Sequence, residues 1–233
     1  MSKSRKLAAL TIILVILLFS NHNLFAQYEE GEDPLYIPEK KLFSAGLVGG
    51  VNQAQVDGDY FAGYYKTGAN VGGIVYANIS KHVSLSMEIL YSQKGSMSNG
   101  PQISPGNSKI IITNYGINVN YAEVPFMINY WDTHKSNIGT GFSVSRLVSS
   151  RELLNVDSFN QVSSIDLNQN YPFKKTGLDF LIGGNLHLVK GLYLNLRFQY
   201  SIVPIRTQLP PADYARADQY NNLWVIRAMY LFR

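Results

Sequence analysis

The feature that most constrains this chain is an alternation of apolar and polar residues, which begins at Leu42 and continues without a helical period. Successive side chains of a β-strand point to opposite faces, so a period of two predicts strands. The clearest segment is 83–92, in which Val83, Leu85, Met87, Ile89 and Tyr91 alternate with Ser84, Ser86, Glu88 and Ser92. This segment predicts a strand with one apolar and one polar face.

Seven further segments alternate in the same way. Their apolar faces run through 43–51, 69–77, 124–128 (in a strand of about 115–130), 138–144, 178–188, 192–200 and 224–232. The connections 78–82, 131–135 and 189–191 are short, whereas those near 53–64, 96–114, 148–174 and 203–220 are long and polar. We therefore predict an all-β fold, an eight-stranded antiparallel up-and-down β-barrel over residues 42–233, with short turns at one end and long loops at the other.

Alternation alone does not say which face of the barrel points outward. A soluble lipocalin-like barrel would put the apolar face inside and a charged face in water. Here the polar face is dominated by Gly, Ser and Asn, and charged residues are 15% of the chain, below the roughly 25% of soluble domains. Small polar residues fit the narrow interior of eight strands. The pattern therefore favours a transmembrane barrel with its apolar face toward lipid.

Aromatic residues gather near the predicted strand ends. Tyr130, Trp131, Tyr230 and Phe232 lie on the turn side, and Tyr65, Tyr91, Tyr200 and Trp224 lie on the loop side. Two such groups match the interfacial girdles of outer-membrane barrels.

The N-terminal region predicts export. Residues 1–26 combine the basic Lys3, Arg5 and Lys6, an apolar stretch over 7–19, and Ala26 before the expected cleavage point, as in a secretory signal peptide. Residues 27–41 are acidic and contain proline, which predicts a flexible periplasmic leader. Short turns of outer-membrane barrels lie in the periplasm, so we expect the cell outer membrane as location and periplasmic N- and C-termini.

Several segments resemble the PorT-like outer-membrane β-barrel family of Bacteroidetes. Residues 121–125 (Tyr-Ala-Glu-Val-Pro) are similar to the family's Tyr-x-Glu-Ile/Val-Pro strand, 178–184 to its glycine-ended sixth strand, and 197–201 to its Arg-aromatic-x-Tyr segment. Phe232 looks like the terminal aromatic residue that serves as the assembly signal, although Arg233 follows it. Residues 202–205 (Ile-Val-Pro-Ile) depart from the family's Gly-Leu and Asn. The resemblance implies the fold and the location, and a role in type IX secretion or gliding belongs to only some relatives.

Five charged residues fall on the polar face, namely Glu88, Glu123, Asp179, Arg197 and Arg227. In a narrow lumen they should pair, because an unpaired buried charge costs several kcal/mol. We expect a structural lumen charge network, with a gated ion path or proton relay as the alternative.

The sequence offers little for catalysis. There is no cysteine, and His82, His134 and His187 fall at the turn end, far from the rim where an enzyme acting on lipid would need an acid–base group. The paired glycines at 49–50, 72–73 and 183–184 precede no helix, so they indicate bends and close packing rather than a phosphate loop. We expect no catalytic, cofactor-binding or metal site, and no cofactor.

The chain has a net charge of +4, and removing the three basic residues of the signal segment leaves +1, so nucleic acid is not an expected partner. We expect a non-enzymatic integral outer-membrane protein that contacts outer-membrane lipid, meets the barrel-assembly machinery during insertion, and is structural or binds an envelope protein through its long extracellular loops. The alternatives are an accessory of type IX secretion or gliding machinery and, less favoured, a lipid-modifying enzyme.

Overall fold

The computed structural model describes residues 42–61, 63–104, 107–158, 161–166, 168, 170–206, 208 and 215–232. The predicted signal peptide (1–26) and periplasmic leader (27–41) lie outside the described residues. Within them the strands are β1 (Phe43–Asp59), β2 (Lys66–Asn78), β3 (Val83–Met97), β4 (Gln102–Ser104), β5 (Asn107–Trp131), β6 (Asn137–Ser158), β7 (Gln161–Asp166), β8 (Thr176–Val189), β9 (Leu192–Ser201) and β10 (Ala215–Leu231).

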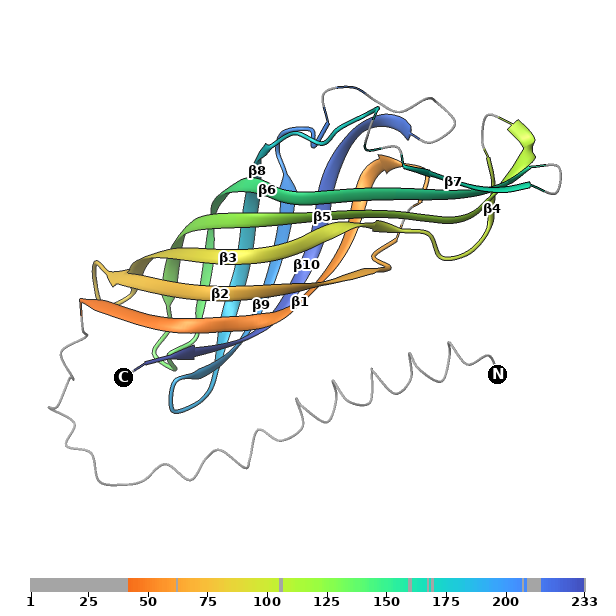
Figure 1. The fold of residues 1–233 in the computed structure, drawn as a ribbon. Coiled ribbons are helices and arrows are strands. Elements are labelled where there is room, and N and C mark those ends of the chain that lie inside the picture. Colours follow the sequence, from red (N-terminus) through yellow and green to blue (C-terminus); the bar gives the residue numbers. More distant parts are fainter. Residues whose placement is uncertain are drawn as a thin grey trace, which may run out of the picture. The chain divides into compact units, whose positions relative to one another are not determined.

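Eight of these strands close into an antiparallel ring (Figure 1). Each strand pairs with the next in the order β1-β2-β3-β5-β6-β8-β9-β10, and β10 returns to β1 with Gly46 opposite Leu231. The short strands β4 and β7 extend the sheet outside this ring, because β4 pairs with β5 and β7 pairs with β6. The predicted eight-stranded up-and-down barrel is confirmed.

The apolar face of the ring points outward. On β3, Ile89 is 66% exposed whereas its neighbour Leu90 is 3% exposed. The same alternation places Leu47, Phe126, Phe142 and Leu196 on the outer surface, and it places polar side chains such as Ser84 and Glu88 inside. A continuous apolar belt therefore surrounds the barrel, and the predicted sense of the alternation is confirmed.

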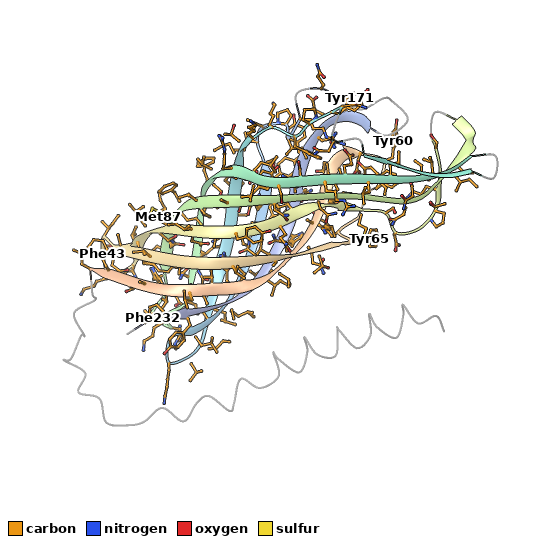
Figure 2. All side chains as sticks on the ribbon, in the orientation of Figure 1. Phe43, Tyr60, Tyr65, Met87, Tyr171 and Phe232 are labelled. Atoms are coloured by element: carbon orange, nitrogen blue, oxygen red, sulfur yellow. The ribbon has the colours of Figure 1, made fainter. Side chains whose placement is uncertain are left out.

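The three tight connections lie at one end of the ring. They join β2 to β3 over 79–82, β5 to β6 over 132–136, and β8 to β9 over 190–191. The last has only Lys190 and Gly191, whose φ angles of 47° and 124° reverse the chain at once. Figure 2 shows Phe43 and Phe232 toward this turn end and Tyr60 and Tyr171 toward the other, which we call the long-hairpin end.

The predicted long loops near 53–64, 96–114, 148–174 and 203–220 are wrong in extent. β1 continues to Asp59, β10 begins at Ala215, and most of the two middle segments forms β4, the first part of β5, the last part of β6 and β7. Paired hairpins satisfy the backbone groups of these segments better than irregular loops do. Together β4, the first part of β5, the last part of β6 and β7 form a sheet that extends past the other strands (Figure 1). We call it the projecting sheet.

The projecting sheet reverses the polarity of its faces. Tyr115, Ile117 and Val119 of β5 point inward, opposite to the outward apolar residues of the belt. On β6 the register shifts at Asn120/Tyr121 of β5, so Val148 is left without a partner and the even residues Glu152, Leu154 and Val156 turn inward. The sequence alternates in the belt and in the projecting sheet, but the apolar residues were predicted to point outward in both.

Candidate functional site

The lumen is closed at the turn end by an apolar group, the turn-end cluster, of Val48, Ile74, Tyr76, Leu90, Trp131, Tyr193, Met229 and Leu231. The Nε1–H of Trp131 donates to Ser84 Oγ at 2.6 Å, and its ring meets that of Tyr76 with centroids 5.3 Å apart. The expected place of Trp131 in an outer girdle is wrong. Trp131 is 7% exposed, because it shares the inward parity of Glu123 and Asn129.

A first charged group lies in the middle of the lumen. Glu88 of β3 accepts from Arg197 Nη1 at 3.2 Å and from Arg227 Nη1 at 2.8 Å, and Arg197 Nη2 donates to its other oxygen. Arg227 also donates to Asn195 Oδ1 at 2.9 Å and to Asn70 Oδ1 at 3.1 Å. One buried carboxylate thus bridges two buried guanidinium groups from β9 and β10.

A second charged group joins β3, β5 and β8. Lys94 Nζ pairs with Asp179 Oδ2 at 2.6 Å and with Glu123, and all three side chains are buried. Asp179 also accepts from Gln199 Nε2 at 2.8 Å and from Ser201 Oγ at 2.7 Å. Among the described residues, Glu123 has only the longer contacts of 3.4 Å from Gln199 besides its ion pair. Lys94 is therefore the main partner of Glu123.

The two groups place all five residues named from the sequence in the lumen, but they do not form one network. Glu88 lies with Arg197 and Arg227, whereas Glu123 and Asp179 lie with Lys94. Lys94 was not predicted as a member, because the alternating segment was taken to end at Ser92, although Lys94 continues the same parity. With Lys94 included, three bases face three acids, and the formal charges of the two groups cancel.

Two of the glycines make room for the lumen arginines. Gly50 of β1 stands opposite Arg227 in register, and Gly183 of β8 stands opposite Arg197. A Cβ at Gly50 would collide with Ile226 O and approach Arg227 Cα to 2.6 Å, whereas one at Gly49 would meet only Val71 at 3.9 Å. The expected close packing holds for Gly50, Gly72 and Gly183, which lie close to the neighbouring backbone.

A third group, the outer-end cluster, fills the long-hairpin end. It comprises Val56, Phe61, Ile112, Tyr115, Ile117, Val119, Tyr121, Leu154, Val156, Phe173 and Ile205. Glu152 and Arg206 pair within it, and the guanidinium lies 3.8 Å from the Phe173 ring centroid. Tyr115 donates to Glu152 Oε1 at 2.6 Å, and burial together with this carboxylate raises the pKa of the Tyr115 phenol well above its usual value. None of these contacts was expected, because the segments were interpreted as loops.

The described residues form a packed interior. No group of three His, Cys, Asp or Glu side chains that could hold a metal ion occurs in the part of the chain that the structure describes. His82 contacts Trp131 O at 3.1 Å, and His134 lies exposed in the turn over 132–136. Phe232 is half exposed beside Tyr230, and its N–H donates to Ala45 O at 2.8 Å.

The closed ring, the outward apolar belt and the internally paired polar groups are the features of an integral outer-membrane β-barrel. Over the described ranges, no helix is long and apolar enough to cross a membrane. The pattern of the outer membrane protein beta-barrel domain family matches residues 25–206, and the chain belongs to this family. The belt therefore faces lipid, and the protein resides in the outer membrane.

The chain shows a limited similarity to solved structures at low sequence identity. The attachment invasion locus protein Ail of Yersinia pestis is 13% identical with a TM-score of 0.45, over 81% of this chain and 98% of Ail. Ail in complex with the heparin analogue sucrose octasulfate is 12% identical with a TM-score of 0.45, over 82% of this chain and 99% of that one. Neisserial surface protein A is 10% identical with a TM-score of 0.39, over 82% and 97%. No curated protein matches the sequence significantly.

Proposed function

We propose that this protein is a non-enzymatic outer-membrane barrel that binds a protein of the cell envelope through its projecting sheet. The observation that carries this proposal is the exposed apolar surface of that sheet. Ile103 of β4 and Ile111 of β5 pair in register and are 65% and 44% exposed. They lie beyond the membrane belt, where water rather than lipid would surround them, and exposed apolar surface of this kind is typical of interaction sites.

The edges of the projecting sheet support the same proposal. β4 and β7 are the first and last strands of the sheet order, so in the described part of the chain each has one unpaired edge. Unpaired backbone N–H and C=O groups of an edge strand can accept a strand from a partner. Among the described residues, the turn-end cluster, the charged groups and the outer-end cluster occupy the lumen. The lumen charge network is accordingly proposed to be structural.

We propose the orientation from the way in which outer-membrane barrels assemble. Outer-membrane barrels insert from the periplasm with short turns remaining there, and β1 begins and β10 ends at the turn end. We therefore place both ends of the barrel and Phe232, the proposed assembly signal, in the periplasm, and the projecting sheet outside the cell.

The test is affinity purification of the protein from its native membrane after mild cross-linking, in parallel with an Ile103→Ser/Ile111→Ser variant. Recovery of a stoichiometric partner by the natural protein and its loss in the variant would support the proposal. The heat-modifiable gel shift of the variant must stay unchanged, so that loss of the partner is not loss of the barrel. Equal recovery by both proteins, or no partner, would refute it.

The identity of the partner decides between the finer functions. The resemblance to PorT-like proteins rests on the motifs at 121–125, 178–184 and 197–201, while the family match extends to outer-membrane barrels in general. Recovery of type IX secretion or gliding components would assign the protein to that machinery as an accessory. Turnover of a membrane lipid by the purified protein alone would instead favour an enzyme.

A further inference from the structure

A polar cleft opens on the outer surface of the barrel where β2, β3, β5 and β6 leave the apolar belt. It has a volume of about 440 Å³ and is lined by Lys66, Gln93, Asn118, Asn120, Ser149, Ser150 and Arg151. No carboxylate of the described residues lines it. The cleft is thus a concave patch with two cations and several amide and hydroxyl groups, and it belongs neither to the lumen nor to the projecting sheet's apolar surface.

The strands place this cleft at the level of lipid headgroups. Gln93 follows Tyr91, the last outward aromatic residue of the belt on β3, and its Nε2 lies 3.5 Å from the Tyr91 hydroxyl. Ser149 follows Val148, which is 62% exposed on β6. Since a strand rises about 3.3 Å per residue, the cleft begins within about 7 Å of the last apolar side chains. Tyrosine at this position is typical of the membrane interface.

The polar side chains hold one another in place. Lys66 Nζ donates to Asn118 Oδ1 across β3, where Gly95, which pairs with Asn118, has no side chain to intervene. Asn120 Nδ2 donates to Ser149 Oγ at 2.8 Å. Arg151 pairs in register with Asn118 and is exposed, so its guanidinium donors face the cleft region.

The Lys66 ammonium is only partly solvated, whereas Arg151 is exposed. Burial lowers the pKa of the Lys66 ammonium, because the cleft removes part of its water, and an anion in the cleft would restore a favourable environment. Further cations, Arg146, Lys174 and Lys175, lie nearby on β6 and before β8, with Arg146 next to Thr176 in register. The alternative is that these polar residues form a hydrated rim that binds no ligand. The position of the cleft directly after the apolar belt and its two cations, Lys66 and Arg151, favour a lipid phosphate, because the phosphates of lipid headgroups lie at this level of a membrane.

We propose that the cleft between Lys66 and Arg151 binds a phosphate group of a lipid in the outer leaflet, such as a phosphorylated glucosamine lipid. Lys66 and Arg151 neutralise the phosphate, and Asn118, Asn120 and Ser149 donate to its oxygens or to adjoining sugar hydroxyls. The site holds the barrel at a defined depth and anchors one lipid on the β3–β5–β6 side. It rests on the orientation proposed above, which is tested separately by labelling in intact cells.

The experiment is native mass spectrometry of the refolded, purified barrel in detergent with diphosphorylated lipid A, and in parallel with its monophosphorylated form. We expect one molecule of lipid A to bind more tightly than any further molecules and to remain bound through buffer exchange. A basic residue near an anionic lipid surface contributes about 1 kcal/mol. Lys66→Gln/Arg151→Gln should therefore weaken this binding roughly 30-fold.

Two controls make the result decisive. Lys175→Gln removes one charge from the same rim outside the cleft and should leave binding unchanged, and Lys66→Arg/Arg151→Lys keeps both charges and should retain most of it. Equal weakening by Lys175→Gln and by Lys66→Gln alone would overturn the proposal in favour of general attraction to the rim. Displacement of the lipid by millimolar inorganic phosphate would show a free-anion site and would also overturn it. Each variant must retain its heat-modifiable gel shift.

Discussion

Replacement of Lys94 by methionine is the sharpest test of the structural role of the lumen charges. Methionine keeps much of the length of the side chain but removes the ammonium between Glu123 and Asp179. Asp179 would keep Gln199 and Ser201 as donors, whereas Glu123 would keep only the 3.4 Å contacts from Gln199. The energetic penalty should therefore fall on Glu123.

The magnitude follows from two limits. Breaking a buried ion pair by removal of one partner costs about 3–5 kcal/mol. The stranded acid can escape by taking up a proton, which for a glutamate of ordinary pKa near 4.3 costs about 4 kcal/mol at pH 7. We expect Lys94→Met to lower the free energy of unfolding by about 3–4 kcal/mol at pH 7. The loss should shrink toward pH 4, where protonation of the free acid becomes cheap.

The assay is equilibrium urea unfolding of the barrel in phospholipid vesicles, followed by tryptophan fluorescence. Lys94→Met/Glu123→Gln should recover about half of the lost stability or more, since the double variant leaves no uncompensated acid at Glu123. Lys190→Met, in the exposed turn before β9, is the matched control and should change little. A Lys94→Met barrel as stable as the natural one, or a double variant no better than the single, would refute the reasoning.

Three further outcomes are expected. Gly50→Ala should destabilise the barrel by about 1–3 kcal/mol or prevent its assembly, because the new Cβ meets the backbone of β10, while Gly49→Ala should be neutral by the same urea assay. Planar-bilayer recording of the purified barrel should show no stable large conductance, and reproducible porin-sized steps would contradict the closed lumen. In intact cells, a membrane-impermeant thiol reagent should label Asn99→Cys at the long-hairpin end and spare Thr133→Cys at the turn end, and the reverse pattern would invert the orientation.

The sequence by itself determined the eight strands of the ring, the turn end and the outward direction of the apolar face. These properties depend on local rules. Side chains of a strand alternate between two faces, and a bilayer requires an apolar outer surface. The faces of residues such as Ile89 and Glu88 can therefore be predicted without knowledge of their neighbours in space. The charges on the inward face were recognised for the same reason.

Tertiary structure alone decided which charges meet and how far the strands extend. Lys94 reaches Glu123 and Asp179 because β3, β5 and β8 surround one lumen at that height, a relation that depends on register around the whole ring. The projecting sheet was not predicted because apolar residues such as Tyr115 and Ile117 point inward there, whereas the alternation was interpreted with all apolar residues outward. Glu152 and Arg206, which are 54 residues apart in the chain, form an ion pair only because the fold brings β6 beside the segment that follows β9.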